Sequence, residues 1–164
     1  MRWISAGTVV LMLFAASCAA APASHDVPKP AACDATVNKP LGDLVAQETM
    51  QPVDNVMVCG TTIGPSRPQR AGAHGGHQLI PLRAPVDGGS VLVEVVTNDE
   101  LDGRVTAPRG ATVFAYGQYF HTSRRQRPFK AGIHDVHCAT HRGADNGWVV
   151  VNGVSYPRGS CPLY

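Results

Sequence analysis

The sequence is short of charged side chains, and this scarcity excludes proteins that bind through their whole surface. Charged residues make up 16% of the 164 residues, and 14 Lys plus Arg against 12 Asp plus Glu leave a net charge of +2. A protein that coats nucleic acid carries a strong basic excess, which is missing here. We therefore do not expect nucleic acid as a partner, and any binding must come from a local site.

The sequence also lacks the common catalytic motifs. It contains no G-x-S-x-G, no P-loop, no G-x-G-x-x-G and no H-E-x-x-H. These absences favour a domain that is not an enzyme. The chain has the length of a single domain with its own core, and scattered Gly and Pro within a 44% hydrophobic composition indicate a globular fold rich in loops.

The amino terminus has the build of an export signal, which we assign to residues 1–21. Arg2 supplies a positive charge, and an apolar stretch from Ile4 to Ala16 precedes small residues. Two cleavage sites compete. A lipobox would end at Cys18 with an unusual Ala in place of Leu, whereas Ala19-Ala20-Ala21 fits an ordinary A-x-A site. The lipobox is slightly favoured, and lipid on Cys18 would anchor the domain to a membrane.

Removal of this signal leaves four cysteines, which is an even number. They are Cys33, Cys59, Cys138 and Cys161. An exported protein with this count is expected to form two disulfides in an oxidising, extracytoplasmic compartment such as the periplasm or the cell surface. Three pairings are open, and the shorter loops favour Cys33 with Cys59 and Cys138 with Cys161.

The segment after the signal predicts a flexible tether followed by one helix. Residues 22–39 are rich in Ala and Pro and show little periodicity. Apolar residues then recur at helical spacing from Leu41 to Met50, with Pro40 suited to the first turn and Pro52 to a stop. We expect a short α-helix here.

Residues 40–164 are expected to form one domain that is mostly β. The apolar or alternating runs that predict strands are Asn55–Thr61, His77–Arg83, Ser90–Thr97, Ala111–Phe120 and Gly147–Tyr156. Asn152-Gly153 is the residue pair of a type I′ hairpin turn. Short strands after one helix, without β-α alternation, predict a small OB-like β-barrel preceded by one short α-helix.

Histidines, a carboxylate and a thiol gather near residue 134 and suggest a metal site. His134, Asp135, His137 and Cys138 are ligand types for a divalent transition metal such as zinc. β-branched neighbours between two glycines favour a strand followed by a turn, which would bring only part of the cluster into one site. His77 is then a candidate ligand from a neighbouring segment.

The cluster has an alternative interpretation that needs no metal. Cys138 would be in a disulfide, and the histidines would be surface residues or hydrogen-bonded core side chains. The spacing matches no standard zinc signature, so both interpretations stay open.

A cationic loop is the second candidate binding feature. Arg124, Arg125 and Arg127 lie close together and would suit a phosphate or an acidic glycan. The alternative is a solvated connection between two strands, because no series of aromatic residues accompanies the arginines.

Several motifs together resemble a known family of small exported bacterial proteins, the domain of unknown function numbered three thousand four hundred sixty-five. The matching residues are His77-Gln78, Asn98, Leu101, Gly110 to Tyr119, Ile133-His134, His137, Gly147-Trp148, Asn152-Gly153 and Tyr156. The resemblance spans about Val53 to Tyr156. The I-H-W-T-H-H-D hallmark is degenerate, with Asp135, Val136, Cys138 and Ala139 in place of Trp, Thr, His and Asp.

This resemblance implies a small exported domain and no established activity. Our leading hypothesis is an extracytoplasmic binding domain, anchored through Cys18, whose cell-envelope ligand meets His77, His134 and His137. The alternative is a metal-dependent hydrolase, for example a phosphodiesterase or nuclease, in which His134 and His137 hold the ion. A purely structural envelope lipoprotein is a third possibility.

Overall fold

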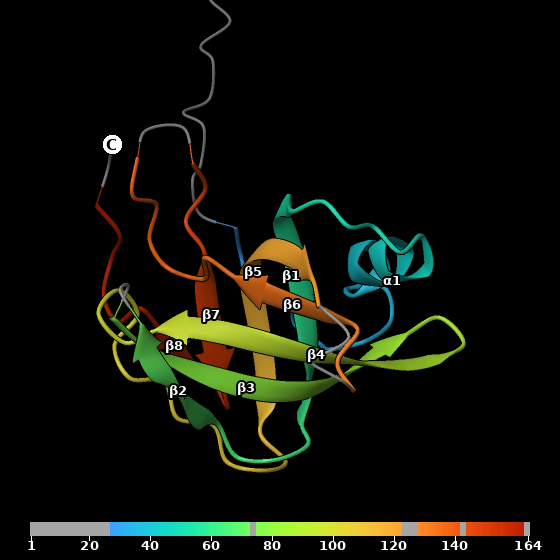
Figure 1. Ribbon diagram of the computed structural model, residues 1–164, viewed down its shortest axis with the longest axis horizontal. Coiled ribbons are helices and arrows are strands. Elements are labelled where there is room, and N and C mark those ends of the chain that lie inside the picture. Colours follow the sequence, from blue (N-terminus) through green and yellow to red (C-terminus); the bar gives the residue numbers. More distant parts are fainter. Residues whose placement is uncertain (1–26, 73–74, 123–127, 142–143, 163–164) are drawn as a thin grey trace, which may run out of the picture.

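The computed structural model describes residues 27–72, 75–122, 128–141 and 144–162, which form one helix and eight strands (Figure 1). The elements are α1 (Lys39–Ala46), β1 (Val53–Thr62), β2 (Arg67–Gly72), β3 (Gly75–Val86), β4 (Gly89–Asn98), β5 (Thr112–His121), β6 (Ala131–His134), β7 (Trp148–Val151) and β8 (Val154–Tyr156). The described ranges contain no helix with the length and hydropathy of a transmembrane segment. The export signal assigned to residues 1–21, including Cys18, lies outside the described residues.

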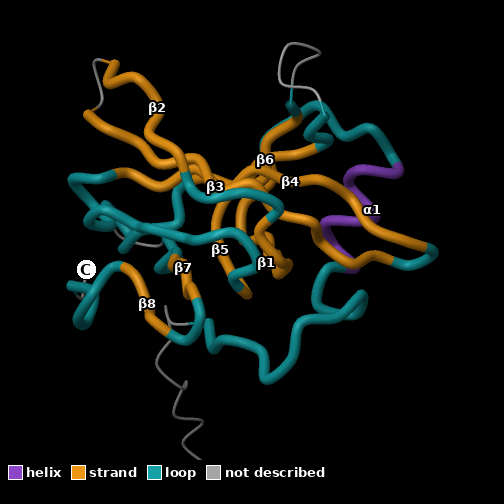
Figure 2. The backbone as a smooth tube through the Cα atoms, turned by 90° about the horizontal axis from the view of Figure 1, so that it is seen from below, coloured by secondary structure: helices purple, strands orange, loops and turns teal. Residues whose placement is uncertain are grey.

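Five strands close into a barrel. The ring runs β1-β3-β4-β6-β5 and returns to β1, with β4 and β6 parallel and the other ring pairs antiparallel. β2 adds to the edge of β3, and β7 and β8 extend from β5. β2 and α1 lie at opposite sides of the barrel in both views (Figures 1 and 2). The prediction of a small OB-like barrel preceded by one short helix is confirmed.

The barrel interior is filled by alternate side chains of its strands. The largest fully buried strand side chains include Tyr119, Ile80, Leu82, Ile133, Val58, Val93, Val95 and Val113. Because successive residues of a strand point to opposite faces, the intervening residues of β3, β4 and β5 face outward. The predicted turn at Asn152-Gly153 is also present, with φ of 47° and 85° at its two residues.

The short helix is fixed to the barrel by the residue before it. Asn38 is fully buried, accepts a hydrogen bond from the Cys59 backbone N–H at 2.8 Å and donates to the Pro85 carbonyl at 2.7 Å. Leu41 enters the core. The helix ends at Ala46, so Met50, which the periodicity had included, lies outside it and is 66% exposed.

The described part of the segment predicted as a tether lies along the barrel. The Trp148 indole N–H donates to the Val27 carbonyl at 2.8 Å, Lys29 lies 4.8 Å from the centre of the Phe114 ring, and Cys33 forms a disulfide with Cys59. We call residues 27–37 the strap. The second disulfide joins Cys138 to Cys161, so the pairing that the shorter loops favoured is confirmed.

Candidate functional site

A groove of about 350 Å³ lies on the outer face of β2, β3 and β4 and reaches the ends of β5 and β6. Its volume falls in the range of small-molecule sites. The lining residues are Gln69, His77, Leu79, Glu94, Val96, Asn98, Phe120, His134, Asp135 and His137. We call it the β3–β4 groove.

The strand register arranges one end of the groove in cross-strand rows. His77 pairs with Gln69 of β2 and with Asn98 of β4, which gives a row of three polar residues. Two residues further along β3, Leu79 pairs with Val96 and forms an apolar row. The floor therefore changes from polar to apolar along the strands.

A third row combines a carboxylate with an aromatic ring. Gly132 of β6 pairs with Glu94 on one side and with Phe120 on the other. The Glu94 side chain is 5% exposed and accepts a hydrogen bond from Arg67 Nη2 at 3.0 Å. The Phe120 and His134 rings meet edge to face, with centroids 5.2 Å apart.

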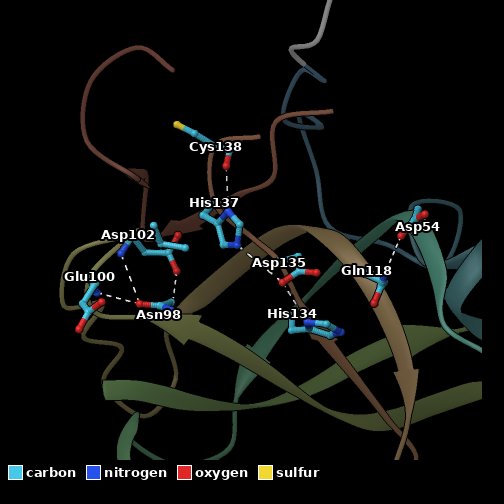
Figure 3. Close-up of polar contacts among 10 residues, drawn as sticks. Asp54, Asn98, Glu100, Asp102, Gln118, His134, Asp135, His137 and Cys138 are labelled. Atoms are coloured by element: carbon cyan, nitrogen blue, oxygen red, sulfur yellow. Dashed lines mark hydrogen bonds and ion pairs between the residues drawn. The ribbon is translucent and has the colours of Figure 1, made fainter. Parts of the chain in front are cut away.

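The turn after β6 brings two imidazoles onto one carboxylate (Figure 3). Asp135 Oδ1 lies 3.0 Å from His134 Nδ1 and 3.6 Å from His137 Nε2, while His137 Nδ1 donates to the Cys138 carbonyl at 2.8 Å. Hydrogen bonds from the two histidines hold the pKa of Asp135 far below its usual range. In return, Asp135 raises the pKa of His137 above its ordinary value.

Two glycines allow this turn to approach the barrel closely. A Cβ at Gly117 of β5 would overlap the His134 carbonyl oxygen, and a Cβ at Gly147 would overlap the Asp135 carbonyl oxygen. Asp135 itself has φ of 53°, a left-handed conformation that Asp tolerates better than most residues. The position of both histidines therefore depends on residues that make no contact with the groove.

A buried carboxylate lies behind the polar row. Asp102 is 3% exposed, and its Oδ2 accepts the Asn98 backbone N–H at 2.6 Å. Its Oδ1 has no hydrogen-bond partner among the described residues. Burial raises the pKa of Asp102 to about 6, while the hydrogen bond from the Asn98 N–H and, to a smaller extent, the nearby His137 oppose that rise.

A second pocket, of about 330 Å³, lies on the other side of the histidine turn. Asp135 and His137 line both pockets. In the second pocket the Tyr116 hydroxyl donates to Asp145 Oδ2 at 3.2 Å, and burial with this carboxylate raises the pKa of Tyr116 to about 12. The exposed His141 lines this pocket rather than the groove.

The structure brings three of the predicted site residues together. His77, His134 and His137 all line the β3–β4 groove. Cys138 is in a disulfide, as the interpretation without a metal expected. Within the described part of the chain, no group of three or more His, Cys, Asp or Glu side chains is arranged to hold a metal ion, so a zinc site stays a prediction.

Other site residues were missed or lie outside the described ranges. Sequence reasoning did not single out Glu94, Phe120 or Asp102. The sequence did carry one signal for Glu94, because it is the single charged residue within the apolar run V-L-V-E-V-V. The arginines predicted to bind an anion, Arg124, Arg125 and Arg127, lie outside the described residues.

Comparisons with known proteins give no further guide to the site. No family model, no curated protein and no solved structure matches this chain. The fold itself offers one: OB barrels bind oligonucleotides and oligosaccharides on the face of their second and third strands. In this barrel those strands are β3 and β4, which carry the groove.

Proposed function

We propose that this protein is an exported OB-like binding domain that takes a cell-envelope ligand in the β3–β4 groove and is not an enzyme. The proposal rests on the outer face of β3 and β4, where an apolar row lies between two rows with polar side chains. A site of this kind binds the apolar surface of a ligand and orients its polar groups.

A screen of small polar and aromatic fragments by amide NMR tests the binding role. We expect the fragments that bind to shift groove amides of β3 and β4, and Phe120→Ala to abolish those shifts. Phe129→Ala, a matched change at a residue that does not line the groove, should leave them intact. Fragments that collect elsewhere, or do not bind at all, would contradict the proposal.

Export and anchoring are the second part of the proposal. The two disulfides indicate folding in an oxidising compartment, and the apolar amino terminus has the build of an export signal. The resemblance to the exported family of unknown function points the same way. Palmitate labelling in an exporting bacterial host should be present in the native chain and lost in Cys18→Ala. Equal labelling of both would refute the lipid anchor.

A metal-dependent hydrolase is the second candidate, favoured by how the histidines are held. His134 and His137 each have Nδ1 against an oxygen, on Asp135 and on the Cys138 carbonyl, as metal-binding histidines commonly do. A bound ion would lower the pKa of a water for attack on a phosphodiester. Elemental analysis of the untagged domain, beside the variant with both histidines changed to Ala, tests this. Stoichiometric zinc in the native domain that is lost in the variant would favour the hydrolase. Absence of zinc from the native domain would rule the hydrolase out.

A further inference from the structure

We propose that a third pocket, between the turn after β4 and the end of β8, binds the carboxyl terminus of a peptide. Residues 101–104 and 156–158 line this pocket, which has a volume of about 380 Å³. We call it the β4–β8 pocket. None of its lining residues lines the β3–β4 groove, so the inference goes beyond the proposed function and does not depend on it.

A buried carboxylate oxygen without a partner is the first reason to expect a ligand in this pocket. Asp102 lines the pocket and is 3% exposed, and its Oδ2 accepts the Asn98 backbone N–H (Figure 3). Its Oδ1 has no hydrogen-bond partner among the described residues. A buried carboxylate oxygen that lacks a donor costs free energy, so a ligand N–H that meets it gains a strong, charge-assisted hydrogen bond.

Two arginines give the same pocket a place for an anionic group. Arg104 and Arg158 both line it, and neither forms an ion pair within the described ranges. Asp102 does not occupy them, because the cation that opposes its pKa rise is His137 rather than an arginine. Arg158 Cζ lies 5.7 Å from the centre of the Tyr156 ring, which holds one guanidinium beside the pocket. Guanidinium groups with free donors suit a carboxylate.

The pocket also has an apolar wall that is open to a ligand. Leu101 is 47% exposed, which makes it one of three large apolar side chains left exposed in the described part of the chain. Tyr156 and Pro157 line the pocket from the segment at the end of β8. An apolar ligand side chain that covered Leu101 would remove apolar surface from water, which favours binding.

The count of donors and acceptors favours a peptide end over a free amino acid. An ammonium group carries three N–H donors, whereas the last peptide N–H is a single donor. Among its described residues the pocket offers one buried acceptor without a partner, Asp102 Oδ1. The last residue of a peptide carries its N–H, its carboxylate and its side chain on one Cα. Asp102, the arginine pair and Leu101 complement these three groups in turn.

Titration of the disulfide-bonded protein with acetyl-Ala-Leu at neutral pH, followed by amide NMR, tests the inference. We expect shifts at the amides of residues 101–104, 156 and 158. The same peptide with a terminal amide should bind about tenfold more weakly, because it lacks the charge that the arginines would meet. An ester analogue, in which oxygen replaces the last N–H, should also bind about tenfold more weakly, because Asp102 Oδ1 then faces no donor.

Substitutions of the two arginines test the carboxylate contact from the protein side. Arg104→Gln and Arg158→Gln should each raise Kd for acetyl-Ala-Leu about fivefold. The double variant should bind the acid and the terminal amide with equal affinity. Arg109→Gln, a matched change at an exposed arginine that does not line the pocket, should leave Kd unchanged.

Asp102→Asn tests the N–H contact. Its side-chain oxygen must still accept the Asn98 N–H, so its NH2 group would face the ligand N–H. Acetyl-Ala-Leu should therefore bind this variant about tenfold more weakly than the native chain, whereas the ester analogue should bind both equally or prefer the variant. Asp87→Asn is the control, and the amide spectrum of each variant shows whether the fold is retained. If Asp102→Asn does not fold, the ester analogue on the native chain and the arginine variants still decide.

Several results would overturn the inference. If the terminal amide binds as tightly as the acid, or if both arginine variants bind like the native chain, the pocket does not recognise a carboxylate. If free leucine binds more tightly than acetyl-Ala-Leu, the ligand is an amino acid and not a peptide end. If no probe shifts the amides of the pocket, no peptide carboxyl terminus binds there. The binding function of the β3–β4 groove survives each of these results, because it is measured at the amides of other residues.

Discussion

Two phenylalanines on one strand show how the open and covered sides of this barrel differ. Phe114 and Phe120 lie six residues apart on β5, and both point outward because inward positions alternate with them. Phe114 is 7% exposed and packs with Cys59 and Val150, with the strap residues Cys33 and Val37 against it. Phe120 instead lies over Gly132 and lines the groove.

The chain uses its own strap to cover one of these aromatic side chains and leaves the other uncovered. The strap reaches Phe114 through the Cys33–Cys59 disulfide and the contact from Lys29. Along the described chain nothing comparable crosses Phe120, whose outward neighbours are a carboxylate and a histidine. Covered aromatic side chains contribute to stability, whereas an uncovered, preorganised one is suited to bind a ligand.

The largest expected effect is the difference in stability between alanine substitutions at the two phenylalanines. Phe114→Ala should lower the free energy of unfolding by about 3 kcal/mol, because it leaves a cavity between strap and barrel. Phe120→Ala should cost less than half of that, since its ring is only half-buried. Urea unfolding followed by circular dichroism measures both. Equal losses would show that the two faces are packed alike.

Removal of the strap disulfide should have the next largest effect. The variant with Cys33→Ala and Cys59→Ala lacks a bridge between residues 26 apart in sequence, and its free energy of unfolding should fall by about 3 kcal/mol. We expect the amide shifts of the β3–β4 groove to stay as in the native chain, because the strap covers the Phe114 end of β5 and the groove lies at the Phe120 end. Groove shifts as large as those near Phe114 would contradict the separation of the two sides.

The sequence predicted the elements of the fold well and the rows of the groove poorly. Alternating apolar runs predicted the strands that form β1, β3, β4, β5 and the β7–β8 hairpin, because burial of one face imposes that period. β2 was missed because R-P-Q-R-A-G has no apolar alternation. Pro68 is tolerated there because β2 lies at a sheet edge.

The candidate site was predicted in part. His134, Asp135, His137 and Cys138 drew attention to the turn after β6, and the β-branched neighbours correctly favoured a strand followed by a turn. Glu94, Gly132 and Phe120 come from three strands, and only the register of those strands makes them neighbours. Register depends on tertiary packing, so this row is not visible in the sequence.

A smaller effect is expected from the buried carboxylate on the open side. Asp102 has its pKa raised from 3.8 to about 6, so between these values the folded protein holds a proton that the unfolded chain has released. The contribution of Asp102 to the free energy of unfolding is therefore fully present below about pH 4, and it is lost as the pH rises through about 6. Asp102→Asn keeps an oxygen acceptor for the Asn98 N–H and removes the titration.

Removal of this titration should change the pH dependence of stability by a measurable amount. Relative to the native chain, Asp102→Asn should gain on the order of 2 kcal/mol of unfolding free energy between about pH 4 and pH 7. Urea unfolding at several pH values provides the comparison, and Asp87→Asn, at an exposed hairpin position, is the control. Parallel pH profiles for the native chain and Asp102→Asn would mean that Asp102 is already ionised at low pH.

The smallest effect concerns the cation over the covered ring. Lys29→Met keeps the aliphatic length over Phe114 and removes the charge, so it should lower the free energy of unfolding by about 0.5 kcal/mol. The double variant with Phe114→Leu isolates the interaction, because the loss from Lys29→Met should vanish once the ring is gone. A loss that persists without the ring would assign the role of Lys29 to its neighbouring backbone contacts. A loss that disappears would show that Lys29 stabilises the covered side through the Phe114 ring itself, a contact for which Phe120 has no counterpart among the described residues.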